Sequence, residues 1–282
     1  MPRTPRVGRC AGTERTLSTY LDDLIAAASR RVDDARAAEP LEALRERAEA
    51  VGDAPSFAAA IAGEGVAVIA EVKRASPSKG EIAADLDAAA QARAYIDGGA
   101  AAVSVLTEPE WFRGSLADLA DVSALRIPTL RKDFIVDPYQ IWEARLAGAA
   151  AVLLIVAALT PRQLGELYDE AVLAGLDVLV EVHDEDDVAE ATAVGANIVG
   201  VNARDLRSFE MDPAAFARLR GRLGPEVTAV AESGITGADD VRRARRDGAD
   251  AVLVGESLVR ADDPRAAVAE LVAAGRVDGG RG

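Results

Sequence analysis

Short apolar runs alternate with longer amphipathic segments along most of this chain. Eight runs rich in Val, Ile, Leu and Ala occupy residues 66–72, 101–107, 128–134, 151–157, 177–183, 197–203, 227–233 and 251–257. They are largely apolar rather than alternating, which is typical of parallel strands buried on both faces. The segments between them suit helices, and several end in glycine just before the next run, as helices commonly do.

Eight successive strand-then-helix units predict a (β/α)8 TIM barrel, and 282 residues is a length typical of one such barrel. The structural alternative is a doubly wound open sheet. Such a sheet usually has fewer strands, and no G-x-G-x-x-G motif follows the first apolar run. We therefore expect an α/β protein built on a TIM barrel.

A helical extension is expected ahead of the first strand. Apolar residues recur at helical spacing from Leu17, and a second helix is predicted over residues 40–51. The expected organisation is a disordered leader over residues 1–14, one barrel domain over 15–275 and a flexible tail over 276–282. The barrel domain includes the helical extension, which covers residues 15–55.

The composition narrows the classes of function. The formal net charge of −15 argues against nucleic acid as the main ligand, because its phosphates would be repelled. No apolar run is long enough for a membrane span, and the N-terminus lacks the apolar core of a secretory signal. Cys10 is the only cysteine and His183 the only histidine, which excludes an internal disulfide and Cys- or His-rich metal sites. We expect a cytoplasmic protein that needs neither metal nor cofactor.

Charged and amide residues stand at the ends of nearly all the predicted strands. In a TIM barrel these ends meet at one face, which carries the active site. Polar groups buried there need partners, either one another in a structural network or a polar ligand. Their number and variety favour a catalytic site; the residues are Glu71, Lys73, Lys132, Asp133, Glu181, Asn202, Arg204, Glu232, Ser233, Gly255 and Glu256.

Lysine is rare in this sequence, and two of its positions fall at this face. Only three of the 32 Lys and Arg residues are lysines. A guanidinium stays protonated at any working pH, whereas a lysine ammonium can act as acid, base or nucleophile. We interpret Lys73 and Lys132 as chemically active and Lys79, beside a glycine, as an ordinary loop charge. The alternative is that these lysines remain by chance.

Two glycine-containing segments close the last two strands and indicate an anion site. They are "ESGIT" at 232–236 and "VGESL" at 254–258. Loops at these positions expose backbone N–H groups, and many TIM barrels bind phosphate there. Either segment alone is also consistent with a plain turn, but the pair at corresponding positions favours phosphate.

These motifs resemble those of indole-3-glycerol phosphate synthase, a family of tryptophan-pathway TIM barrels. The similarity extends over residues 17–272 and is carried by "IAEVKRASPSKG", "SVLTE", "WFRGSLADL", "LRKDFIVDPYQIWEARLAGA", "AVLLIVAAL", "VLVEVHDE", "GVNARDL", "AESGI" and "VGESLVR". The resemblance implies a carboxy-lyase whose small phosphorylated substrate is 1-(2-carboxyphenylamino)-1-deoxyribulose 5-phosphate. The enzyme would close a ring, release carbon dioxide and water, and form indole-3-glycerol phosphate.

The resemblance also implies catalytic roles for five residues. Lys132 would protonate the substrate ketone as general acid, with a pKa that burial lowers toward the working pH. Glu181 would be the general base, or second acid/base group, of the dehydration. Lys73 would position the anionic end of the substrate or share in proton transfer. Glu71 and Asn202 would orient the lysines and the sugar hydroxyls.

Further residues would bind the substrate on the same grounds. Phe112 and Phe134 would line an aromatic pocket, although ordinary core packing fits them equally well. Glu256 stands where the family can carry a small residue, and its carboxylate would repel phosphate unless only its backbone N–H is used. The substrate-binding set is Arg74, Ser76, Phe112, Phe134, Leu153, Leu179, Arg204 and Glu232, and the phosphate-binding set is Ser76, Ser233, Gly234, Gly255 and Glu256.

Two other functions stay open on the sequence alone. Phosphoribosylanthranilate isomerase, another phosphosugar barrel, is expected to use a cysteine, but Cys10 lies in the predicted leader. A catalytically silent barrel that binds a phosphorylated metabolite is the non-enzymatic alternative, against which Lys73, Lys132 and Glu181 argue. His183 shares strand parity with Glu181 but is interpreted as a surface histidine. The protein is expected to be a monomer or weak oligomer.

Overall fold

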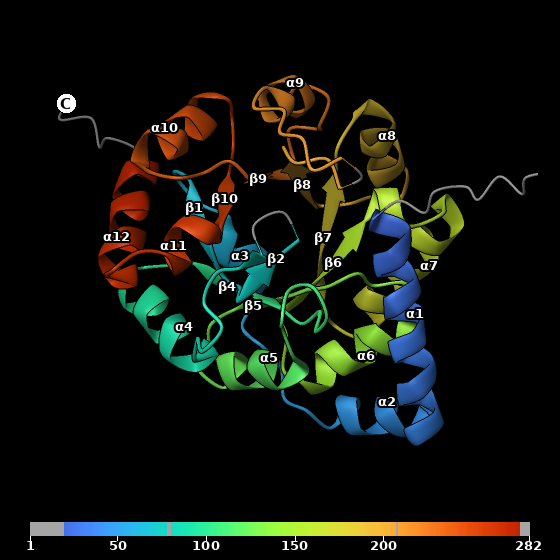
Figure 1. Ribbon diagram of the computed structural model, residues 1–282. Helices are drawn as coiled ribbons and strands as arrows, with labels where there is room; N and C mark the ends of the chain where they lie inside the picture. Colours follow the sequence, from blue (N-terminus) through green and yellow to red (C-terminus); the bar gives the residue numbers. More distant parts are fainter. Residues whose placement is uncertain (1–19, 78–79, 207, 277–282) are drawn as a thin grey trace, which may run out of the picture.

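Eight parallel strands close into a barrel in the computed structural model, which describes residues 20–77, 80–206 and 208–276 (Figure 1). The strands follow the order β1-β10-β9-β8-β7-β6-β5-β4, and the last closes on the first. Each lies within one of the eight predicted apolar runs. The predicted TIM barrel is confirmed and the open sheet is wrong; the strands are β1 Ala67–Val72, β4 Ala102–Leu106, β5 Thr129–Lys132, β6 Ala151–Ile155, β7 Asp177–Val182, β8 Ile198–Asn202, β9 Thr228–Glu232 and β10 Ala251–Val254.

The side chains of each strand alternate between the barrel interior and the layer of helices. Outward positions such as Val68 and Val178 pack against the helices. Because the alternation has a period of two, a polar residue two places after an interior apolar one points into the barrel mouth, as Glu71, Lys132 and Glu181 do. The interior apolar positions are Ile69, Ala102, Leu130, Leu153, Leu179, Ile198, Val230, Ala251 and Leu253.

Helices surround the strands (Figure 1). Among the described residues, seven helices follow a residue whose side chain accepts a hydrogen bond from the first turn, which fixes where the preceding loop ends. The caps are Ser56, Asp87, Ser115, Asp137, Thr160, Asp184 and Asp263. The helices are α1 Tyr20–Ala38, α2 Leu41–Glu49, α3 Phe57–Ile61, α4 Ala88–Asp97, α5 Leu116–Ser123, α6 Pro138–Leu146, η1 Val156–Ala158, α7 Pro161–Leu173, α8 Glu185–Ala193, α9 Ala215–Arg220, α10 Ala238–Arg246, α11 Glu256–Val259 and α12 Pro264–Gly275.

The expected helical extension is present as α1 and α2. α2 packs along α6, and α1 buries Leu21 in the same cluster as the barrel interior. α3 lies at the end of the barrel where the strands begin. There the Ala58 N–H donates to the carboxylate of Asp177, the first residue of β7, at 2.8 Å. None of the helices in the described part of the chain is both long and apolar enough to span a bilayer. The expected leader and most of the expected tail, with Cys10 and Lys79, lie outside the described residues.

Arg31 ties α1 to the rim of the barrel. Its guanidinium lies 3.2 Å from Glu108 and 2.9 Å from Asp133, two carboxylates that are almost fully buried. The Glu108 carboxylate also accepts the backbone N–H groups of residues 110–112, and so shapes the loop after β4. Asp133 therefore belongs to a structural network that joins α1 to the loop after β4. Its charge does not serve ligand binding alone.

A small sheet in the loop after β1 completes the rim. β2 (Ala75–Ser76) and β3 (Gly80–Glu81) pair antiparallel. The backbone N–H groups of Ile82 and Ala83 both donate to the Arg74 carbonyl oxygen, at 2.8 and 3.0 Å. This hairpin keeps Ser76 at the mouth of the barrel.

Candidate active site

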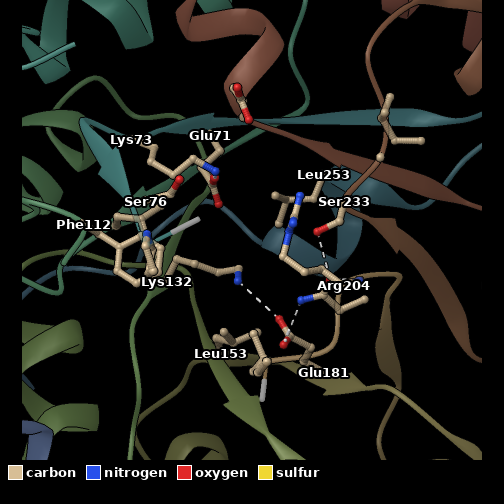
Figure 2. Close-up of a pocket in the computed structure, with 18 of the residues that line it drawn as sticks. Glu71, Lys73, Ser76, Phe112, Lys132, Leu153, Glu181, Arg204, Ser233 and Leu253 are labelled. Carbon is tan, nitrogen blue, oxygen red and sulfur yellow. Dashed lines mark hydrogen bonds and ion pairs between the residues drawn. The ribbon is translucent and has the colours of Figure 1, made fainter. Parts of the chain in front are cut away.

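A cavity of about 470 Å³ opens at the C-terminal end of the strands. Figure 2 shows charged side chains from β1, β5 and β7 directed toward one another around it. Lys73, Lys132 and Glu181 thus meet at one rim of the barrel, although their strands are far apart in the chain. The residues named from the sequence that line the cavity are Glu71, Lys73, Ser76, Phe112, Lys132, Asp133, Phe134, Leu153, Glu181, Asn202, Arg204, Ser233, Gly234, Gly255 and Glu256.

Lys132, the last residue of β5, faces Glu181 of β7. Its Nζ lies 3.2 Å from Glu181 Oε2. The other carboxylate oxygen, Oε1, accepts a hydrogen bond from Asn202 Nδ2 at 3.1 Å. The Asn202 amide is held in turn, because its oxygen accepts the Ser233 hydroxyl at 2.8 Å and the Arg204 backbone N–H at 3.0 Å. This chain of hydrogen bonds orients the Glu181 carboxylate toward the ammonium group.

The surrounding charges keep this pair ionised. Burial alone would lower the pKa of Lys132, but the charges of Glu181, Glu232 and Glu71 outweigh burial and raise that pKa above its ordinary value. The expectation that burial lowers the Lys132 pKa toward the working pH is therefore wrong. Burial would raise the pKa of Glu181, but the charges of Lys132 and His183 and the Asn202 hydrogen bond bring it below its ordinary value.

Glu232, the last residue of β9, lies beneath the pair rather than in the lining of the cavity. Its Oε2 is 3.7 Å from Lys132 Nζ, and its side chain is 2% exposed. Burial, and then repulsion by Glu181, raise the pKa of Glu232 well above its ordinary value, so the protonated acid is favoured. Gly200 of β8 leaves room for it, because a Cβ there would stand 2.0 Å from Glu232 Oε1.

Lys73 and Glu71 form a second ion pair on another side of the cavity (Figure 2). Lys73 Nζ lies 2.8 Å from Glu71 Oε1. Gly255, which follows β10, passes close to both groups. A Cβ at that position would lie 2.4 Å from Glu71 Oε1 and 3.1 Å from Lys73 Nζ. The glycine therefore leaves the space that this ion pair occupies.

The turns after β9 and β10 form the side of the cavity expected to hold phosphate. Ser233 and Gly234 both adopt positive φ, at 65° and 74°, which makes a tight turn directly after the strand. Gly255 precedes the short helix α11, whose first residue is Glu256. The Glu256 carboxylate accepts a hydrogen bond from Arg260 Nε at 3.1 Å. Its negative charge is thus balanced by a guanidinium that also lines the cavity.

Apolar side chains line the cavity among the charged ones. The rings of Phe112 and Phe134 lie 6.4 Å apart, tilted by 39°. Both line the cavity and both pack on the core cluster of the barrel interior, so the two roles considered for them coexist. Leu153 reaches the cavity from below, whereas Leu179 is fully buried in the interior and does not line it.

Arg74 lies away from the cavity. Its two terminal nitrogens bind the Asp118 carboxylate of α5 at 2.6 and 2.8 Å. The same guanidinium donates to the carbonyl oxygens of Leu86 and Arg113. The structure thus contradicts the expected contact of Arg74 with substrate, because its guanidinium is held outside the cavity by Asp118 of α5 and by two loop carbonyl oxygens.

His183 is not on the surface, contrary to the interpretation of the sequence. Its side chain is 11% exposed and lies beside the Glu181 carboxylate. The interpretation failed because His183, two residues after Glu181, places its ring between the Glu181 and Asp187 carboxylates instead of in solvent.

Known proteins are similar in sequence to this chain over nearly its whole length. A family model described as "Indole-3-glycerol phosphate synthase" matches residues 21–271. The chain is 51% identical over 258 residues to indole-3-glycerol phosphate synthase 1 of Streptomyces coelicolor, across 91% of this chain and 96% of that protein. It is 49% identical to indole-3-glycerol phosphate synthase of Mycolicibacterium vanbaalenii, across 92% of this chain and 95% of that protein. The chain belongs to the indole-3-glycerol phosphate synthase family.

Membership of the indole-3-glycerol phosphate synthase family confirms the expected carboxy-lyase of tryptophan biosynthesis. The phosphoribosylanthranilate isomerase alternative is therefore wrong. Among solved structures, 3-hexulose-6-phosphate synthase from Salmonella typhimurium matches with a TM-score of 0.61 and 16% identity, over 74% of this chain and 98% of that one. At that identity the likeness supports the barrel fold alone.

Several residues of this synthase site were not foreseen from the sequence. Leu206, Phe209 and Met211, all in the irregular segment after β8, and Ile155 add apolar surface to the cavity. The signal available for the loop was its apolar residues within an otherwise polar stretch. A glycine inside the apolar run of β8 was the available signal for Gly200, since strand glycines often mark close approach.

No group of three or more His, Cys, Asp and Glu residues among those described is arranged to hold a metal ion.

Proposed function

We propose that Lys132 and Glu181 perform the acid–base steps that convert 1-(2-carboxyphenylamino)-1-deoxyribulose 5-phosphate to indole-3-glycerol phosphate, carbon dioxide and water. The observation that carries the proposal is the 3.2 Å approach of Lys132 Nζ to Glu181 Oε2 inside a cavity that also holds Lys73. The volume of about 470 Å³ suits a substrate of this size.

In the ring closure, the aromatic carbon that bears the carboxylate attacks the ketone carbon. The π electrons of the carbonyl move to its oxygen, and Lys132 gives that oxygen a proton, so that an alcohol forms. The raised pKa keeps the ammonium charged before the step. The charge stabilises the oxygen as it becomes basic enough to take the proton. A guanidinium could supply the charge but not the proton.

Decarboxylation and dehydration complete the reaction. Loss of carbon dioxide returns the bonding electron pair to the ring and restores its aromaticity. Lys132, recharged by a proton from solvent, then protonates the hydroxyl, which leaves as water, while a proton is removed from the neighbouring carbon to create the indole double bond. Glu181, held ionised beside Lys132, is the base for that carbon-bound proton. The overall reaction thus takes up one proton from solvent, and transfer of the carbon-derived proton from Glu181 to Lys132 restores both groups.

The remaining groups bind and orient the substrate. Lys73 neutralises an anionic end of the substrate, with Glu71 limiting its movement through the 2.8 Å contact. The phosphate accepts hydrogen bonds from N–H and O–H groups of Ser233 and Gly234, in the turn after β9, and of Ser76 and Gly255. At Glu256 only the backbone N–H donates to the phosphate. The phenyl ring lies against Phe112, Phe134 and Leu153, and Asn202 and Arg204 fix the sugar side.

The wider organisation is proposed on composition. The net charge of −15 supports a small phosphorylated substrate as the main ligand and disfavours nucleic acid. We propose a single barrel domain over residues 15–275 that acts in the cytoplasm, as a monomer or weak oligomer, without metal or cofactor.

The proposed acid and base are tested by following product fluorescence after the carboxyphenylamino substrate is added to the full chain. Lys132→Met and Glu181→Gln are each expected to lower kcat by about 10²–10⁴-fold, because each removes a proton-transfer group without changing side-chain length greatly. Substrate binding by both variants, measured by calorimetry, serves as the control for folding. Binding by the wild-type protein without product would support the silent-barrel alternative, and unchanged rates in both variants would contradict the roles assigned here.

A further inference from the structure

The single histidine of the chain packs behind the proposed base. His183 stands one residue beyond the end of β7, two places after Glu181, and its side chain is 11% exposed. Its Nε2 lies 3.4 Å from Glu181 Oε1, the oxygen that also accepts the Asn202 amide. Glu181 is therefore flanked by two basic side chains, with Lys132 at one carboxylate oxygen and His183 at the other.

Asp187 holds the far side of the imidazole. Its Oδ2 lies 3.4 Å from His183 Nδ1 and accepts the His183 backbone N–H at 2.8 Å. Asp187 itself is fixed in the first turn of α8, where its N–H donates to the Asp184 side chain at 2.9 Å. Neither ring nitrogen makes a hydrogen bond of good geometry within the described residues, so ion-pair contacts with Asp187 and Glu181 dominate its surroundings.

The groups that face this histidine are acidic. Glu181 comes from β7, Asp187 from α8, and Asp205, from the segment after β8, acts on the imidazole at longer range. Burial would lower the pKa of His183, but Asp187 and Glu181 more than compensate, and the pKa lies above its ordinary value. The imidazolium in turn is the second of the charges that lower the pKa of Glu181, after Lys132.

We propose that His183 is a positioning residue which, as an imidazolium anchored on Asp187, holds the Glu181 carboxylate in the ionised, cavity-facing state that the base requires. This inference rests on the role proposed for Glu181. Lys132 loses its positive charge when it protonates the substrate ketone, and Glu181 then loses the cation that does most to keep it ionised. The imidazolium remains beside Glu181 Oε1 at that stage, so the carboxylate stays available for the later carbon-bound proton.

The charge of His183 can be measured without substrate. Because the chain has one histidine, one imidazole resonance in an NMR titration reports this residue alone. Its midpoint is expected above about 6.5, the ordinary value, and Glu181→Gln and Asp187→Asn are each expected to lower it. A midpoint at or below the ordinary value in the wild-type protein, unmoved by Glu181→Gln, would overturn the proposal. Loss of turnover would not affect this measurement, so failure of the proposed function stays distinguishable.

The catalytic consequence appears in the pH profile. Without the imidazolium the pKa of Glu181 rises, so His183→Gln is expected to move the acid limb of kcat/KM upward by about one pH unit. The rate on that limb then falls about tenfold, while the plateau at higher pH changes little. His183→Lys retains a positive charge and is expected to restore the acid limb. A pH-independent loss in His183→Gln, with no rescue by lysine, would show that the residue only packs.

Discussion

The two lysines at the mouth of the barrel differ in the number of carboxylates near each ammonium group, not in their exposure to solvent. Lys73 is 18% exposed and Lys132 is 16% exposed. Within the described residues, Lys73 has one carboxylate partner, Glu71 at 2.8 Å. Lys132 lies within 3.7 Å of two, Glu181 and Glu232, and also feels the charge of Glu71. The two lysines are therefore similarly buried, but Lys132 lies among more acidic side chains than Lys73 does.

This difference suggests a division of work. A cation with a single partner can turn toward an incoming anion at the cost of one contact, which suits Lys73 to binding. Lys132 is held by acids from β7 and β9, and any proton it releases leaves those acids without their cation. The proton of Lys132 is thus exchanged only when the substrate oxygen becomes a strong base, which suits it to the chemical step.

The largest expected contrast comes from removing each ammonium in turn. Lys132→Met is expected to lower kcat by about 10²–10⁴-fold. Lys73→Met is expected mainly to raise KM, by about 10–100-fold, because one charge-assisted contact to the substrate is lost. Steady-state kinetics on both variants measure the two constants, and thermal unfolding checks that each variant is folded. Equal losses of kcat in the two variants would mean that the lysines share the proton transfer.

Two glycines allow each lysine site to be disturbed without touching a charge. Gly255→Ala places a methyl group against Glu71 and Lys73, whereas Gly200→Ala places one against Glu232. In both cases the obstructing atoms are ends of side chains, so the carboxylate must swing aside. We expect Gly255→Ala to raise KM about tenfold, and Gly200→Ala to lower kcat about tenfold with about 1–3 kcal/mol of destabilisation.

Each glycine variant is the matched control of the other, since each adds one methyl group against a glutamate carboxylate. Stopped assays over a range of substrate concentrations separate the KM effect from the kcat effect. If both variants changed only KM, the two lysine sites would not be functionally distinct.

The fold was largely readable because buried parallel strands leave continuous apolar runs. All eight strands lie inside those runs, with the ends displaced by at most a few residues. The same regularity made much of the site predictable. Strand parity carries Glu71, Lys132 and Glu181 into the mouth, and the barrel topology brings their strands together whatever their separation in sequence.

What the sequence did not predict depends on partners that approach from elsewhere. Arg74 is held by Asp118, 44 residues away, and nothing local to Arg74 announces that contact. The direction of the Lys132 pKa shift depends on acids from three other strands, so a rule about burial alone gave the wrong sign. Phe209 reaches the cavity from an irregular segment, where no periodicity orients a side chain.

The smallest expected effect is on stability, and it distinguishes the two acids beside Lys132. Glu232 has a raised pKa, so folding takes up a proton at pH values where the unfolded chain is ionised. Stability is lost as pH rises above about 4.3, the ordinary value of glutamate. Glutamine imitates the protonated acid without that loss. Glu232→Gln is therefore expected to raise Tm by about 2–4 °C at neutral pH, with the gain shrinking toward pH 4.

Glu181, in the same cluster, is expected to change stability with pH in the opposite direction to Glu232. Its pKa is lowered, so its stabilising contribution is present above the ordinary value of glutamate and is lost as pH falls through the folded-state pKa. Glu181→Gln should accordingly lower Tm most at neutral pH, where Glu232→Gln raises it. Thermal unfolding followed by circular dichroism between pH 4 and pH 8 measures both variants. Shifts of the same sign would mean that Lys132 does not discriminate between its two acids, because the ion pair with Glu181 is what leaves Glu232 to carry the proton.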